Sequence, residues 1–325
     1  MKNSSAIRRL GAAVLCLGLL GVACGEANGT TEDPGTGAGG DALAGEIAID
    51  GSSTVFPIAQ AAAEDFQIEN PDVKISVGFA GTGGGFEAFC AGDTEVSTAS
   101  RAIEEEEAAC LEDAGIGFTE FQVGVDGLAI VTNPATDWVD CMTFEEMAAV
   151  YAPGSKVTRW SEVNSDWPDT EIQIFGPDPD SGTYDYFAEE VADPEAEEPA
   201  TRDDMTQSAD DNVLVQGVAG DEGSIGYFGF AYFQENTDKL KAVQVDNGES
   251  GCVEPTVETV LANEYPLSRP LFFYVANDAM ESPEITAFVE YWVTNAAEYA
   301  TAVGYIEAPE EASSANEEAL SGLTG

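Results

Sequence analysis

The chain has 325 residues, of which 61 are acidic and 11 are basic, so its formal net charge is −50. No basic face can be assembled from this composition, which excludes nucleic acid as a general partner and adhesion of the protein surface to anionic lipid. Hydrophobic residues make up 44% of the chain, which predicts two folded domains with sizeable cores rather than general disorder.

The N-terminus has the features of a targeting segment. A short basic start precedes an apolar run over residues 10–23, which is too short to span a bilayer and is typical of a signal peptide. The run ends at a cysteine, Cys24, in a context similar to a bacterial lipoprotein cleavage site. Residues 1–23 are therefore predicted to be a signal peptide, and residues 24–45 a lipidated cysteine with a flexible tether. The protein would then be extracytoplasmic, in the periplasm or at the cell surface, and anchored to the membrane through lipid. An ordinary secretory signal is the alternative.

Export changes how the cysteines are interpreted. Once the signal and the lipidated residue are set aside, four cysteines remain in an oxidising compartment. Among three connectivities the sequence favours Cys90–Cys110 and Cys141–Cys252, because the first two flank one short unit and the last two bracket one long block. Neither a Cys-x-x-Cys spacing nor a histidine is present, so no metal site and no cofactor are expected.

From residue 46 onward, strand and helix patterns alternate, which predicts an α/β fold. In chain order we expect a strand at 46–49, a helix at 55–66, a strand at 73–79, a short helix through Phe89, a strand at 96–99, a helix at 103–111 and a strand at 118–123. The apolar strand 126–133 would cross into a second domain, which would contain a helix at 144–150, a strand at 171–175, a helix after Thr183, a helix at 212–219 and a strand at 224–228. The segment 266–276 would return to the first domain, and a helix at 283–302 would close it. The predicted domains are residues 46–124 plus 271–325, and residues 125–270.

Three turns share one pattern, in which a strand is followed by Gly, Ser and Thr and then by a helix. They are residues 51–54, 81–84 and 180–183. Helix N-termini leave backbone N–H groups unpaired and carry partial positive charge, hydroxyls add donors, and glycine lets a ligand approach closely. In open α/β sheets such turns lie at the carboxyl ends of strands, where ligands bind. Two turns in one domain and one in the other therefore predict an anion site in a cleft.

Five segments carry a specific resemblance to a known family. They are DGSSTVFPIAQ (50–60), GFAGTGGGFEAFCAGDTEVSTASR (78–101), FGPDPDSGTYDYF (175–187), IGYFGFAYF (225–233) and YPLSRPLFFYV (265–275). In this order, within residues 46–305, they resemble the phosphate-specific solute-binding proteins of bacterial ABC importers. The resemblance implies a type II periplasmic-binding-protein fold, in which two α/β domains joined by a two-strand hinge enclose a phosphate in the cleft between them.

The resemblance also implies which residues bind the ligand. They would be Ser53 and Thr54 from the first turn, Thr82 from the second, Ser181, Gly182 and Thr183 from the third, and Ser100 with Arg101 at the strand end between them. Two places depart from the pattern of the family, because Ser100 stands where an Asp acceptor is usual and Pro177 where an Arg is usual. Arg101 is therefore expected to supply the positive charge. Arg269, in the return strand, is expected to be structural and to hold the domain junction.

Selection of phosphate over sulfate needs a hydrogen-bond acceptor. A protonated phosphate oxygen must donate a hydrogen bond somewhere, and sulfate has no such proton. The candidate acceptors are Asp180, Asp178 and Asp126. For each of them the alternative role is to cap a helix or to lie in a solvated loop.

Other functions fit the sequence less well. A calcium loop beginning at Asp178 would place Thr183 where the sharp turn wants glycine. A hydrolase or phosphatase acting on phosphate esters is the main rival, but with no histidine a Ser-His-Asp triad is impossible. The sequence thus predicts a non-enzymatic, monomeric phosphate receptor that docks on an ABC transporter permease. It leaves open a related oxyanion as ligand, a sensing role, and whether the acidity reflects a saline habitat.

Overall fold

The structure is a computed structural model that describes residues 42–179, 181–196 and 198–324. The predictions for the signal peptide, for Cys24 and for most of the tether lie outside the described residues, as does Asp180. No helix within the described part of the chain is both long and apolar enough to cross a membrane.

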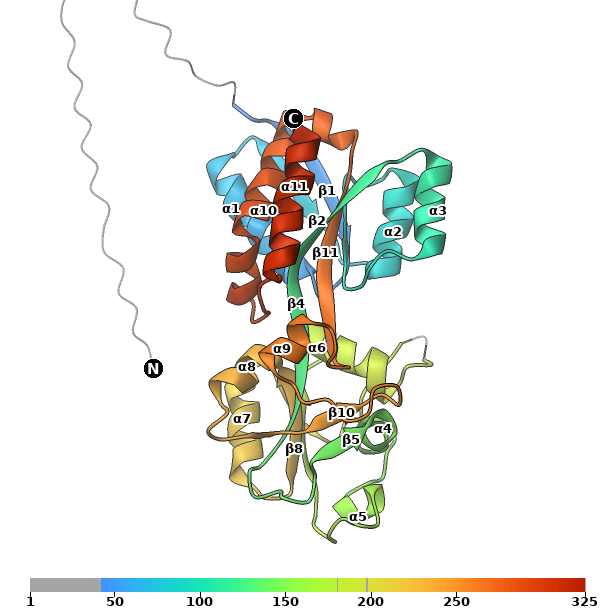
Figure 1. Cartoon of the computed structure of the whole chain (residues 1–325), viewed down its shortest axis with the longest axis vertical. Helices are drawn as coiled ribbons and strands as arrows, with labels where there is room; N and C mark the ends of the chain where they lie inside the picture. Colours follow the sequence, from blue (N-terminus) through green and yellow to red (C-terminus); the bar gives the residue numbers. More distant parts are fainter. Residues whose placement is uncertain (1–41, 180, 197, 325) are drawn as a thin grey trace, which may run out of the picture. The chain divides into compact units, whose positions relative to one another are not determined.

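The first part of the chain builds a parallel arrangement of strands with helices between them (Figure 1). Its strands lie in the order β2-β1-β3, and both neighbours of β1 run parallel to it. A proline near the start of α1 fixes a helical φ angle there, and Gly92 ends α2 in the left-handed conformation. The elements are β1 (Gly45–Gly51), α1 (Phe56–Glu69), β2 (Val73–Val77), α2 (Thr82–Ala91), β3 (Val96–Ala99) and α3 (Glu105–Ala114).

Two long strands connect this part to the rest of the fold. They are β4 (Phe118–Thr132) and β11 (Ser268–Ala276), which pair antiparallel, and β11 lies between β3 and β4. The separate strands predicted at 118–123 and 126–133 are one continuous strand in the structure, because β11 pairs with β4 on both sides of Gly124. A Cβ atom at Gly124 would lie 3.0 Å from the carbonyl oxygen of Ile306, so glycine is what allows the C-terminal chain to approach.

The second part of the chain continues from the far end of β4. There β4 pairs antiparallel with β8 and β9, and β6 runs parallel to both β8 and β7. The short strands β5 and β10 form a sheet of their own. The elements are β5 (Cys141–Thr143), α4 (Phe144–Tyr151), α5 (Trp160–Val163), β6 (Gln173–Pro177), α6 (Gly182–Phe187), the π-helix η1 (Ala188–Ala192), β7 (Thr206–Ser208), α7 (Asp211–Gly220), β8 (Ser224–Gly229), α8 (Phe230–Glu235), β9 (Lys241–Ala242), β10 (Gln244–Asp246) and α9 (Val257–Leu261).

The buried apolar residues fall into separate hydrophobic cores. The buried members of one core all lie between Val125 and Leu267. Those of a second core come from residues 47–123 and 271–300, and a small third core around Phe86 and Tyr274 draws on the same two stretches. Burial of each apolar side chain contributes about 1.5–3 kcal/mol, so each core stabilises its own part of the fold.

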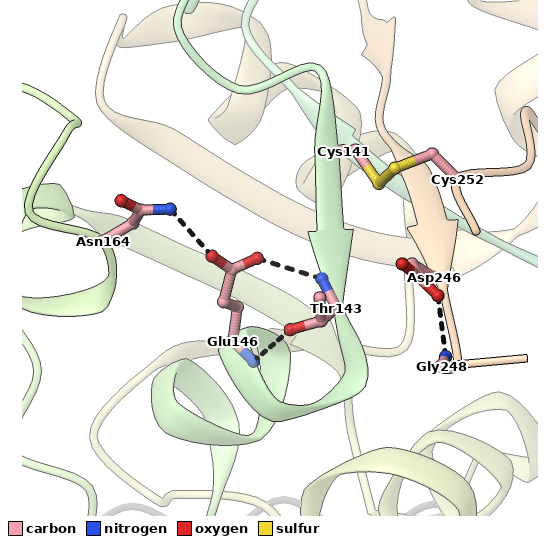
Figure 2. Close-up of a disulfide and its surroundings, with 7 residues drawn as sticks. All are labelled: Cys141, Thr143, Glu146, Asn164, Asp246, Gly248 and Cys252. Atoms are coloured by element: carbon pink, nitrogen blue, oxygen red, sulfur yellow. Dashed lines mark hydrogen bonds between the residues drawn. A yellow bond between two sulfur atoms is a disulfide. The ribbon is translucent and has the colours of Figure 1, made fainter.

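Both predicted disulfides are confirmed. Cys90 joins Cys110 across 20 residues of sequence, and Cys141 joins Cys252 across 111. Figure 2 shows the second bond beside the start of α4, where Thr143 and Glu146 cap the helix by exchanging hydrogen bonds with each other's backbone N–H groups. The disulfide therefore links the segment after β10 to β5, directly before the capped N-terminus of α4.

The chain ends in two helices packed on the first part of the fold. Helix α10 (Pro283–Ala302) has the predicted bounds and follows a short 3-10 turn, η2 (Ala279–Glu281). Helix α11 (Glu310–Thr324) was not predicted, and it packs beside α10 and β4 (Figure 1). Asn316 of α11 exchanges two hydrogen bonds with the backbone of Gln122, at 3.1 and 2.7 Å, which fixes the helix on the strand.

Candidate anion-binding cleft

A cleft of about 570 Å³ opens where the turns after β1, β2 and β3 meet residues of α6, η1 and β11. Because these three strands run parallel, their carboxyl ends lie at one edge of the sheet, which is where ligands bind in open α/β folds. The predicted residues Ser53, Thr54, Thr82, Ser100 and Arg101 all line this cleft. The expected convergence of the first two turns on one site is therefore seen in the structure.

Glycines hold the first two turns against each other. The N–H of Gly81 donates to the carbonyl oxygen of Gly51 at 2.9 Å, and Gly81 has a φ of +85° that favours glycine. A Cβ atom on Gly85, in the first turn of α2, would lie 2.4 Å from the Cα of Gly51. The close packing of α2 on β1 thus requires glycine, and it sets where Thr82 is presented to the cleft.

Hydroxyl groups form a connected layer along this side of the cleft. The Oγ1 of Thr82 and the Oγ of Ser100 lie 3.2 Å apart, and the same Thr82 oxygen accepts from the backbone N–H of Ser100 at 3.2 Å. In the first turn, the buried Ser52 accepts from the N–H of Thr54 at 3.2 Å and so holds the turn. This arrangement leaves hydroxyl donors facing the cleft without adding formal charge.

The third turn lies beside the first one, although its residues do not themselves line the cleft. Ser181 caps α6 by accepting from the N–H of Thr183 at 3.2 Å. A Cβ atom on Gly182 would lie 3.4 Å from the Cα of Thr54 and 3.7 Å from the hydroxyl of Tyr305. Ser181, Gly182 and Thr183 are therefore brought against the first turn, at the place where the two parts of the fold face each other.

Arg269 lines the cleft and contacts hydroxyls that follow β1 and β3. Its Nη2 donates to the Oγ1 of Thr54 at 2.6 Å, and its Nη1 lies 3.5 Å from the Oγ of Ser100. Its guanidinium carbon is 3.6 Å from the centre of the Tyr186 ring, a cation–π contact. Arg269 is thus both a junction residue, as the sequence predicts, and a cation that faces the site, which sequence reasoning missed.

A buried carboxylate holds Arg269 in place. Asp126 is 1% exposed, and its Oδ2 accepts from the Nε of Arg269 at 3.2 Å. Its Oδ1 is buried and has no hydrogen-bond partner among the described residues. Burial raises the pKa of Asp126, and the charge of Arg269 opposes that rise. An unpaired buried oxygen of this kind costs about 1–3 kcal/mol. Asp126 is not itself among the described residues that line the cleft, and its connection to the cleft runs through Arg269.

Arg101 lines the cleft, but nearby acids already engage it. Its Nη1 and Nη2 donate to the two carboxylate oxygens of Glu107 at 2.8 and 2.7 Å, and its Nε lies 3.2 Å from Glu104. The hydrogen bond to Glu107 raises the pKa of Arg101. Because two acids already pair with Arg101, its attraction for an anionic ligand is weaker than the sequence predicted.

Acids from the second part of the fold lie near the site. Glu189 and Glu190 are exposed and line the cleft, whereas the half-buried Asp185 is not among the lining residues. Desolvation raises the pKa of both Asp185 and Glu189, although Arg269 opposes the rise in each. Asp178 is not among the described residues that line the cleft, but its carbonyl oxygen accepts from the N–H of Ser181 at 3.1 Å.

The described residues contain no group of three or more histidine, cysteine, aspartate and glutamate side chains arranged to hold a metal ion. The cleft brings together the guanidinium of Arg269 and a group of hydroxyls at the ends of strands. These are the donors that recognise a tetrahedral oxyanion.

Residues 36–296 match the model of the PBP superfamily domain. The chain belongs to the PBP superfamily. Among curated superfamily relatives, it is 45% identical over 270 residues to Protein SphX of Synechocystis sp., covering 82% of this chain and 79% of that protein. It is 38% identical over 294 residues to Phosphate-binding protein PstS of Staphylococcus aureus, covering 90% and 85% respectively. These matches confirm the predicted relationship to phosphate-binding proteins of this superfamily.

Solved structures of the superfamily share the fold. A possible phosphate binding protein from Planctomyces limnophilus has a TM-score of 0.83 and 45% identity, covering 87% of this chain and all of that one. An ABC-type phosphate transport receptor from Vibrio cholerae has a TM-score of 0.61 at 22% identity, covering 81% and 99%, and this likeness concerns the fold alone. The predicted α/β fold of the periplasmic-binding-protein type is confirmed.

Proposed function

We propose that this protein is an extracytoplasmic solute-binding protein that captures inorganic phosphate in the cleft and delivers it to an ABC-type permease. The observation that carries the proposal is Arg269, a guanidinium held by a buried carboxylate and bonded to two of the hydroxyls predicted to bind the ligand. The relatives from Staphylococcus aureus and Planctomyces limnophilus, which are described as phosphate-binding proteins, support phosphate as the ligand. Binding needs no catalytic step, so the protein is proposed to be a receptor rather than an enzyme.

We further propose that two domains close on the anion. Domain I would comprise residues 46–124 and 271–325, and domain II residues 125–270, a division that follows the separate hydrophobic cores. The strands β4 and β11 would form the hinge. Ser53, Thr54, Thr82 and Ser100 would bind from domain I, and Ser181, Gly182 and Thr183 would bind from domain II as the cleft closes.

We also propose that the protein is exported and anchored to the membrane. The signal-like residues 1–23 and the lipoprotein-like context of Cys24 support an exported chain anchored through lipid. A monomer is proposed, because one cleft and one hinge suffice for capture and delivery. Labelling of whole cells with radioactive palmitate would test the anchor, since a Cys24→Ala chain is expected to take up no label.

Calorimetric titration of residues 25–325 tests the function itself. Phosphate is expected to bind tightly with one ion per chain, and sulfate is expected to give little heat because it lacks a proton to donate. Titration with a phosphate ester serves as the control for a hydrolase, since turnover would release heat continuously instead of saturating. The absence of saturable heat with phosphate would refute the proposal.

Asp126 is proposed to accept a hydrogen bond from a protonated oxygen of the ligand. The substitution Asp126→Asn keeps the size of the side chain but lets the amide donate to sulfate, so the preference for phosphate over sulfate is expected to fall by about 10- to 100-fold. Competition calorimetry at neutral pH measures this ratio. Asp178→Asn is the matched comparison, and a larger loss of preference there than in Asp126→Asn would reassign the acceptor.

A further inference from the structure

The aromatic ring of Tyr186 covers one face of the guanidinium of Arg269. The Cζ atom of Arg269 lies 3.6 Å from the centre of this ring, which is van der Waals contact. Tyr186 is 3% exposed and belongs to the hydrophobic core between Val125 and Leu267, and it also lines the cleft. A side chain packed this tightly presents a fixed surface to the guanidinium.

The two parts of the fold hold Arg269 in different ways. The first part contacts the edge of the guanidinium, where Thr54 and Ser100 accept from the terminal nitrogens at 2.6 and 3.5 Å. Asp126 accepts from Nε at 3.2 Å. Helix α6 of the second part supplies Tyr186, which covers the face instead. Hydrogen bonds at the edge alone would let the guanidinium tilt, and a ring packed against its face restricts that movement.

A contact on the face of a guanidinium uses none of its N–H donors. Each terminal nitrogen carries a pair of N–H groups, so Arg269 keeps one on each nitrogen for a ligand after it has bonded to the two hydroxyls. Arg101 is held differently, because both carboxylate oxygens of Glu107 accept from its terminal nitrogens, and its Cζ atom lies 6.0 Å from the centre of the Phe86 ring. The aromatic ring therefore fixes Arg269 without using the donors that an anion needs.

We propose that Tyr186 is a positioning residue for phosphate, and that its ring holds the guanidinium of Arg269 in the orientation that offers N–H groups to the ligand. This inference rests on the proposed function and deepens it, because it names the residue of the second part that prepares the ligand-binding cation. The competing role is core packing alone. The neighbouring Phe187 has only that role, since it is fully buried and stacks on Tyr227 with ring centres 4.0 Å apart.

Calorimetry of residues 25–325 with inorganic phosphate measures the effect on binding. Tyr186→Leu removes the ring and is expected to lower phosphate affinity by about tenfold. Tyr186→Phe keeps the ring and is expected to stay within about threefold of native. The matched control is Phe187→Leu, which is expected to lower stability in urea unfolding but to keep affinity within about threefold of native. Tyr186→Met provides a second variant should Tyr186→Leu fold poorly.

A second measurement needs no ligand. NMR of the same chain with isotope-labelled arginine follows the Nε–H group of Arg269, whose signal is assigned by its loss in Arg269→Lys. In the native chain the ring is expected to shift this signal, and exchange with water is expected to be slow because Nε donates to the buried Asp126. Tyr186→Phe should keep both properties. Tyr186→Leu should lose the ring shift and exchange about tenfold faster.

The outcomes separate the two proposals. Phosphate affinity within about threefold of native in Tyr186→Leu would overturn the positioning role and leave the receptor function standing. Equal losses in Tyr186→Leu and Phe187→Leu would assign the effect to damage of the core, and an equal loss in Tyr186→Phe would assign it to the hydroxyl; either result overturns the role of the ring. A native chain that binds no phosphate would refute the proposed function, and the Nε–H signal would still decide whether the ring holds Arg269.

Discussion

Replacement of Arg269 by methionine is expected to lower phosphate affinity by at least about a hundredfold, which corresponds to roughly 3 kcal/mol. Arg269 is the cation that bonds directly to hydroxyls of the cleft, and a charged donor is worth more than a neutral one. Arg101→Met is the matched comparison. Because Glu107 and Glu104 already engage Arg101, its loss is expected to change affinity by less than about tenfold.

The stability of the variant must be separated from its affinity. Removal of Arg269 leaves the buried Asp126 without its cation, which typically costs about 3–5 kcal/mol of folding free energy. The double variant Arg269→Met with Asp126→Asn removes the stranded charge and is expected to recover most of that stability but none of the affinity. Urea unfolding and calorimetry measure the two effects. Greater affinity loss in Arg101→Met than in Arg269→Met would restore Arg101 as the main ligand cation.

Removal of the Cys141–Cys252 bond is expected to lower the free energy of unfolding by about 4–5 kcal/mol, the chain-entropy value for a closed loop of roughly 100 residues. The structure closes 111 residues with this bond and only 20 with Cys90–Cys110. Paired Cys→Ser substitutions at each bond allow the comparison, and the shorter loop is expected to cost about 3 kcal/mol. Urea unfolding of both variants measures which disulfide contributes more to the free energy of unfolding.

The two disulfide variants also test whether the bonds shape the site. Cys141 lies in β5, and Cys252 follows β10, in the small sheet that packs beside α4 rather than among the residues that line the cleft. Phosphate affinity in the Cys141→Ser, Cys252→Ser chain is therefore expected to stay within about threefold of native at low temperature, where the variant remains folded. If removal of either disulfide lowered the free energy of unfolding by the same amount, loop length would not determine how much each bond stabilises the fold.

Local patterns predicted most of the fold. The turn at residues 81–84 could be recognised because glycine, hydroxyl residues and an adjoining helix pattern all occur within one short segment. The bounds of α10 followed from Pro283 and a long apolar period. Helix α11 was not predicted because its sequence is mostly polar and has few large apolar residues. Leu320 and Leu323 pack against the second core, and Asn316 bonds to Gln122 of β4, which lies 194 residues away in sequence.

The candidate site was predicted where it depends on local signals and missed where it depends on strand register. Arg269 meets Asp126 only because β11 and β4 pair with these two residues opposite each other, and they are 143 residues apart in the chain. Glu107, by contrast, lies six residues after Arg101, so the acidic run there was a signal that this arginine had nearby partners. Glu189 and Glu190 follow the third turn in the sequence, but the sequence alone could not show that they line the cleft.

The position of β11 has a consequence for how the chain is made. This strand, which ends at Ala276, is inserted between β3 and β4, so the sheet of the first part lacks the strand that joins β3 to β4 until nearly the whole polypeptide has been synthesised. The second part, which is contiguous in sequence, can collapse earlier. Chains that end at residue 267 and have been released from the ribosome should therefore contain a folded later half attached to an incomplete earlier one. The order in which the two halves acquire protease resistance is thus the reverse of their order in the chain.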